Sequence, residues 1–87
     1  MKVLNAQEQL ICKRALETLD TVAAGLPPKC LFDQVERQVG CRIDDLARKE
    51  LADFMAGKEW IYSYTDKLTG NWCLAVRQSG ILAAAAL

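Results

Sequence analysis

The stretch from Ile43 to Gly80 constrains the fold most, because its hydrophobic pattern changes from a helical to a strand period within a few residues. In its first part, the apolar residues recur close to every 3.6 positions, as on one face of an amphipathic helix. Two short runs rich in aromatic and β-branched residues follow, separated by turn formers. The pattern predicts a helix over about 44–56 that leads into a β-hairpin over about 59–77.

Two further helices are predicted before this stretch. Asn5 is a good N-cap and Glu8 stands in the capping-box position, which predicts a first helix over about 5–24. The Leu26–Pro28 segment then enforces an extended linker, because the residue before a proline avoids the α region. Behind it, a second helix is predicted over about 29–39.

The end of the chain predicts a short terminal helix over about 80–87, because its alanine run has a high helix propensity. This tail carries no charged side chain, and a helix that is apolar all round needs burial. It can dock on the first helix or form a dimer interface, so Ile81, Leu82 and Leu87 are predicted interface residues. With 87 residues, the chain is expected to form one domain over 1–87.

Composition excludes several classes of protein. The hydrophobic fraction of 52% is ample for a core, yet no apolar run is long enough to span a membrane. The N-terminus turns polar too early for a secretory signal, so a cytoplasmic protein is expected. Eleven basic and eleven acidic residues give a formal charge of zero. Nucleic-acid affinity comes largely from phosphate neutralisation, so DNA binding would depend on local charge placement.

The four cysteines are expected to be free thiols in a reducing cytosol. They are Cys12, Cys30, Cys41 and Cys73, and no two of them have the close spacing of a zinc knuckle. Cys41, in the turn before the third helix, is expected to be the most exposed thiol and is a redox-sensor candidate. The chain has no histidine to act as a base. We therefore expect no enzyme, no metal site and no cofactor.

The order of helix, proline linker, helix, short turn, helix, hairpin and short helix resembles the winged helix-turn-helix superfamily across the whole chain. Residues 43–65 resemble the family's third helix and its transition into the wing. Residues 72–83 resemble the second wing strand and its exit, where Ser79 and Gly80 open the final helix. Small winged-helix proteins of Mu-like prophages end in a similar way, with a glycine eight positions after the tryptophan of a strand, as Gly80 follows Trp72.

This resemblance implies an α+β fold with three helices, a C-terminal β-hairpin wing and a short terminal helix. The proline linker would hold a short first strand or an extended arm. In DNA-binding members the third helix enters the major groove and the wing lies beside it. The predicted DNA contacts are therefore Arg42, Arg48, Lys49, Lys67 and Asn71.

Purely structural roles for these predicted DNA contacts stay open. The window from Ile43 to Lys58 holds three basic and four acidic residues, a net charge of −1. On the solvated helix face, ordinary ion pairs can account for the basic residues Arg42, Arg48 and Lys49. The acidic partners would be Asp44, Asp45 and Asp53. At the wing tip, Lys67 and Asn71 can be residues that a turn requires.

The aromatic residues of the hairpin offer an alternative function. Trp60 and Tyr62 are predicted interface residues, since not every aromatic side chain of the hairpin can be buried in so small a domain. The competing interpretation pairs Trp60 with Trp72 across the hairpin, or lets them cover the edge of the core. The sequence thus predicts a DNA-binding transcriptional regulator, as a homodimer, and alternatively a winged helix that contacts another protein.

Overall fold

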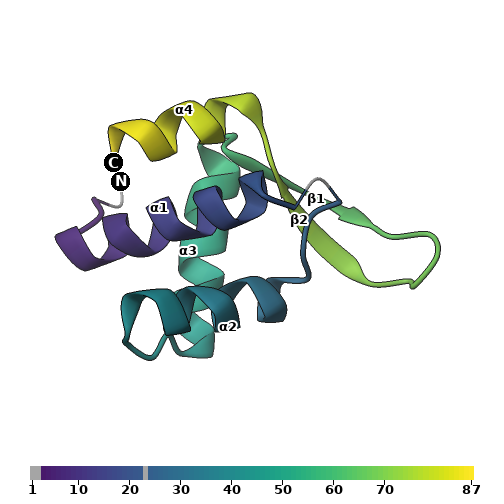
Figure 1. Ribbon diagram of the computed structural model, residues 1–87, viewed down its shortest axis with the longest axis horizontal. Helices are drawn as coiled ribbons and strands as arrows, with labels where there is room; N and C mark the ends of the chain where they lie inside the picture. The colour runs from purple at the N-terminus through teal and green to yellow at the C-terminus, as the bar shows by residue number, and fades with distance from the viewer. Residues whose placement is uncertain (1–2, 23) are drawn as a thin grey trace.

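The computed structural model describes residues 3–22 and 24–87, which form four helices and one β-hairpin (Figure 1). The elements in chain order are α1 (Ala6–Asp20), α2 (Pro28–Val39), α3 (Asp45–Gly57), β1 (Ile61–Thr65), β2 (Trp72–Val76) and α4 (Gln78–Ala86). The first three helices pack around a common core, the hairpin projects to one side, and α4 packs on α1 (Figure 1). The predicted α+β fold with a wing is confirmed.

Helix α1 begins as predicted and ends early. The Asn5 side chain accepts a hydrogen bond from the Glu8 amide (2.8 Å), and the Glu8 carboxylate accepts one from the Asn5 amide (3.1 Å), which completes the capping box. The prediction that the helix continues to residue 24 was wrong, because α1 ends at Asp20. Thr21 closes the helix with its hydroxyl on the Thr18 carbonyl (2.7 Å), and the chain turns before its next contact with the hairpin. The predicted helical residue 23 lies outside the described part.

Helices α2 and α3 form the helix-turn-helix pair. Pro28 occupies the first turn of α2, one residue before the predicted start, where its missing N–H costs nothing. Gly40 ends the helix with a φ of 73°, a conformation that glycine adopts without strain. The Asp44 carboxylate caps α3 by accepting a hydrogen bond from the Ala47 amide (2.8 Å). Both caps fix the short turn that aims α3 across α2.

The hairpin is antiparallel and pairs Ile61 with Val76 and Thr65 with Trp72. The proline linker adds an isolated bridge to it, in which the Leu26 and Leu74 amides each donate to the other residue's carbonyl (2.9 and 2.8 Å). Of the short first strand and the extended arm that the resemblance allowed, the described linker matches the extended arm, since it forms a single bridge outside the two-stranded sheet. The bridge ties the linker between α1 and α2 to the wing.

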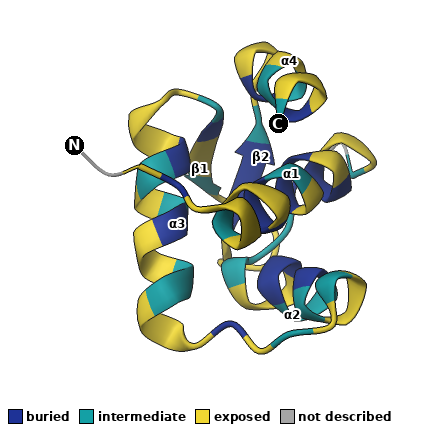
Figure 2. Ribbon diagram, turned by 90° about the vertical axis from the view of Figure 1, so that its left-hand side faces the viewer, coloured by how far each residue is buried: buried dark blue, intermediate teal, exposed yellow. Residues whose placement is uncertain are grey.

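The core lies between the helices and the inner face of the hairpin, as the buried positions in Figure 2 show. Its largest fully buried side chains are Cys12, Leu16, Leu19, Leu31, Phe32, Val35, Leu51 and Met55. Helix α4 starts at Gln78, two residues before the prediction, and docks on α1, where Lys13 donates to the Ala84 carbonyl (2.8 Å). Of the two ways to bury the tail, the structure shows docking on α1, although Leu82 stays 65% exposed.

Candidate nucleic-acid interface

The outer face of α3 is where a winged helix would meet DNA, and its charge is mostly negative. One cation and three carboxylates are exposed on it: Asp45, Lys49, Glu50 and Asp53. Asp45, Lys49 and Asp53 follow one another at intervals of four residues and therefore share one edge of the helix. A polyanion is repelled by this edge everywhere except at Lys49.

Arg48 does not belong to this exposed set, because its guanidinium points to α2. One terminal nitrogen, Nη2, lies 2.6 Å from Glu36 Oε1 and 3.0 Å from Asp33 Oδ1, while Nε donates to the Ile43 carbonyl (2.8 Å). The guanidinium also lies 6.0 Å from the centre of the Phe32 ring, and the side chain is only 17% exposed. Arg48, Glu36 and Asp33 therefore form a clamp that holds α2 and α3 together. The interpretation that Arg48 pairs with Asp44, Asp45 or Asp53 was therefore wrong, because its carboxylate partners are on α2.

The clamp shifts the pKa values of its members. The hydrogen bond from Arg48 is the main cause that lowers the pKa of the Glu36 carboxyl, and the Ile43 amide, which donates to the same oxygen (2.8 Å), adds to it. The pKa of Asp33 is also lowered, first by Arg48 and then by Lys29. In return, the Glu36 carboxylate raises the pKa of Arg48. All three groups are charged at neutral pH.

The other predicted DNA contacts do not converge on one spot. Arg42 is exposed in the turn between α2 and α3, whereas Lys67 and Asn71 are exposed in the wing turn, toward the other end of the molecule's longest axis (Figure 1). That axis extends 37 Å. The predicted contacts are therefore spread over two ends of the molecule and form no compact basic patch.

The wing turn is closed by hydrogen bonds among its own residues. Asp66 accepts from the Gly70 amide (2.7 Å) with its carbonyl and from the Leu68 amide (2.9 Å) with its carboxylate, and its amide donates to the Asn71 carbonyl (2.8 Å). Gly70 has a φ of 73°, which favours glycine. The bonds hold Lys67 and Leu68 outward at the tip, where Leu68 is 96% exposed.

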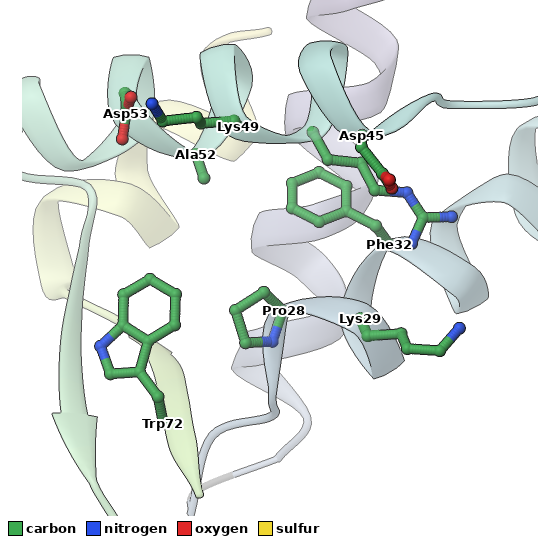
Figure 3. Close-up of a pocket in the computed structure, with 9 residues that line it drawn as sticks. Pro28, Lys29, Phe32, Asp45, Lys49, Ala52, Asp53 and Trp72 are labelled. Carbon is green, nitrogen blue, oxygen red and sulfur yellow. The ribbon is translucent and has the colours of Figure 1, made fainter.

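A hollow of about 620 Å³ lies beside the outer face of α3, between the start of α2 and the strand β2 (Figure 3). Its lining residues are Pro28, Lys29, Phe32, Asp45, Arg48, Lys49, Ala52, Asp53 and Trp72. Trp72 forms one wall and is 54% exposed. The sequence did not indicate this hollow, because its walls come from three elements that are distant along the chain.

The aromatic residues of the hairpin are arranged differently from the predicted pair. Trp60 packs edge-on against Phe54 of α3 (ring centres 5.7 Å apart), so the prediction that Trp60 pairs with Trp72 was wrong. Trp60 instead covers the edge of the core, the other interpretation left open. Tyr62 is exposed, and the Cζ atom of the Arg77 guanidinium lies over its ring, 5.0 Å from the ring centre.

The thiols also differ from expectation. Cys30, near the start of α2, is exposed, whereas Cys41 is half-buried, so the expectation that Cys41 is the most exposed thiol was wrong. Gln7 of α1 donates a hydrogen bond to the Cys41 sulfur (2.9 Å). Across residues 3–22 and 24–87, no group of three histidine, cysteine or carboxylate side chains is placed to hold a metal ion.

Comparison with known proteins defines the class of fold. The chain is similar in structure to the PcaV transcriptional regulator from Streptomyces coelicolor, crystallised with its natural ligand, with a TM-score of 0.63 at 16% sequence identity. The match covers 94% of this chain and 51% of that one, so the chain spans about half the length of PcaV. The chain therefore has a winged-helix fold.

No protein-family model matches the chain, and no curated sequence is significantly similar to it. The likeness to small proteins of Mu-like prophages stays a prediction. No helix in the described part of the chain has both the length and the hydrophobicity needed to cross a bilayer.

Proposed function

We propose that the chain is a winged-helix DNA-binding protein of the transcription-regulator type. The observation that supports the proposal is the likeness in fold of nearly the whole chain to a transcriptional regulator. In winged helices that bind DNA, the helix-turn-helix unit and the wing lie against the duplex. Lys49 is the exposed cation on α3, and Lys67 and Asn71 project from the wing. In this mode Lys49 contacts the major groove, and the wing residues contact the backbone beside it.

Arg42 extends this contact from the turn between α2 and α3. Arg48 positions α3 and does not read bases, because its guanidinium is committed to Glu36 and Asp33. With three exposed carboxylates on α3, each copy would bind DNA weakly, and a dimer would gain affinity by engaging two half-sites. We place this function in the cytoplasm.

Binding of the full chain to random-sequence duplex DNA, measured by fluorescence anisotropy at several salt concentrations, tests the proposal. About three phosphate contacts predict a slope of about −3 in a plot of log affinity against log salt. Lys49→Glu and Lys67→Glu should each weaken binding at least about tenfold at low salt. Arg14→Glu, on the exposed side of α1, changes the net charge equally and should bind like the wild type. Undetectable binding at low salt, or an unchanged Lys49→Glu variant, would contradict the proposal.

The dimer would use the outer face of α4 together with α1. Leu82 is 65% exposed on α4 and Leu10 is 40% exposed on α1. Leu82→Glu should convert a sedimenting dimer to a monomer, because a carboxylate would be buried without a partner. Leu68→Glu at the wing tip is the matched control and should stay dimeric. A wild-type chain that sediments as a monomer at every concentration would refute the dimer.

Docking on another protein is the second candidate function. The hollow at Trp72 and the carboxylates of α3 favour it, because an exposed indole beside negative charge suits a protein partner better than a phosphate backbone.

A further inference from the structure

The hollow between α2, α3 and β2 has the features of a binding site. Its volume of about 620 Å³ is in the range of pockets that accept a side chain or a small ligand. Pro28, Phe32, Ala52 and Trp72 supply its apolar surface. In Figure 3 the Trp72 indole and the Pro28 ring lie on two sides of the opening, and Ala52 faces it from α3.

Trp72 is the wall that an occupant would bury. Its side chain is half-exposed, and within residues 3–22 and 24–87 it stacks on no other ring, whereas Trp60 packs on Phe54. An indole gains a large area of contact when an apolar group covers it, which makes tryptophan a frequent anchor of protein interfaces. The occupant therefore needs an apolar side chain.

The charged residues at the rim of the hollow determine which residues can flank the apolar side chain of the occupant. Asp45 and Asp53 lie on the rim and form no ion pair within the described residues. Among the described cations that line the hollow, Lys49 is the one that also forms no ion pair. The other cations, Arg48 and Lys29, are already neutralised by carboxylates of α2. The rim thus has a net charge of −1, which attracts a cationic flank and disfavours a phosphate.

We propose that this hollow is a docking site for a segment of a partner protein in which an apolar side chain is flanked by arginine or lysine. The apolar side chain covers Trp72 between α2 and β2, and the basic residues face Asp45 and Asp53. The inference goes beyond DNA binding and does not depend on it, because the surface that holds the apolar side chain is formed by Trp72, Pro28 and Ala52, none of which would contact phosphate. Occupancy would shield Lys49, so a docked segment and a duplex would exclude one another.

Nuclear magnetic resonance of the full chain provides a direct test, because the chain has two tryptophans and hence two indole N–H signals. The probe is the synthetic peptide Ac-Ala-Arg-Leu-Phe-Arg-Ala-NH2, and the control replaces both arginines by glutamate. The basic peptide should shift the Trp72 indole signal and the amides of 45–53 in a saturable way at about millimolar concentration or below. The Trp60 signal should stay in place. The acidic peptide should bind at least about fivefold more weakly.

Variants separate the apolar from the charged contribution. Ala52→Arg fills the hollow from a partly exposed position and should abolish the Trp72 shift, with the amide spectrum still that of a folded chain. A double variant, Asp45→Asn with Asp53→Asn, changes the net charge of the rim from −1 to +1 and should lose or reverse the preference for the basic peptide. Tyr62→Ala, on the hairpin outside the lining, should bind like the wild type.

Three results would overturn the docking site. They are equal binding of the two peptides to the wild type, saturable shifts that map elsewhere, and no shift up to the solubility of the peptide. A shift of Trp72 by duplex DNA without any by the basic peptide would also overturn it and assign the hollow to DNA. Lys67→Glu distinguishes the two functions, because it should weaken DNA binding and leave peptide binding unchanged.

Discussion

Replacing Gly80 by alanine is expected to lower the free energy of unfolding by about 3 kcal/mol, because a methyl group has no space there. An added Cβ would overlap the carbonyl oxygen of Trp60 and lie 2.9 Å from Val76 Cγ2. The Trp60 carbonyl cannot turn away cheaply, since it accepts a hydrogen bond from the Arg77 amide (2.8 Å). Either α4 or the start of β1 would have to move. Urea unfolding followed by tryptophan fluorescence measures the loss.

Gly57→Ala is the matched control. Gly57 is the last residue of α3, and an added Cβ there meets nothing within 4 Å. This variant should be neutral or more stable by about 0.5–1 kcal/mol, because alanine favours the helix. If Gly80→Ala unfolds at the same urea concentration as Gly57→Ala, Gly80 does not lie against the Trp60 carbonyl as described.

Gly80 also shows what a sequence can and cannot predict. Its place at the opening of the last helix was implied by the resemblance to winged-helix proteins, in which a glycine follows the strand tryptophan by eight positions. The close approach to Trp60 depends on how the start of α4 lies against the start of the hairpin, which no local rule contains. The start of α1 was predicted correctly, because the capping box at Asn5 is an interaction between residues that are close along the chain.

The candidate site required tertiary information. Arg48 was correctly placed on α3, but its partners are on α2, and rules for pairs three or four residues apart consider only one helix. For the same reason, sequence periodicity could not decide that Phe54 would cover Trp60 and leave Trp72 exposed. The resulting hollow has walls from three elements, so it becomes visible only when the fold is known.

Arg48→Ala is expected to destabilise the chain by about 1–2 kcal/mol at neutral pH, because it removes the clamp between α2 and α3. The loss comprises two ion pairs, the bond to the Ile43 carbonyl and the contact with the Phe32 ring. Lys49→Ala is the matched control, because Lys49 is the next residue of α3 and its side chain is exposed. The free energy of unfolding of this variant should differ from that of the wild type by less than about 0.5 kcal/mol. Urea unfolding of both variants makes the comparison.

The pH dependence of this difference identifies the clamp as its cause. The folded pKa values of Glu36 and Asp33 lie below their ordinary values of 4.5 and 3.8, with Arg48 as the first cause of each shift. The clamp is thus fully effective above the unfolded pKa values and is lost as pH falls through the lowered folded ones. The stability difference between wild type and Arg48→Ala should be constant from about pH 6 to pH 8 and shrink below about pH 4. A difference that persists unchanged in acid would mean that Arg48 acts through its packing on Phe32 and not through the carboxylates.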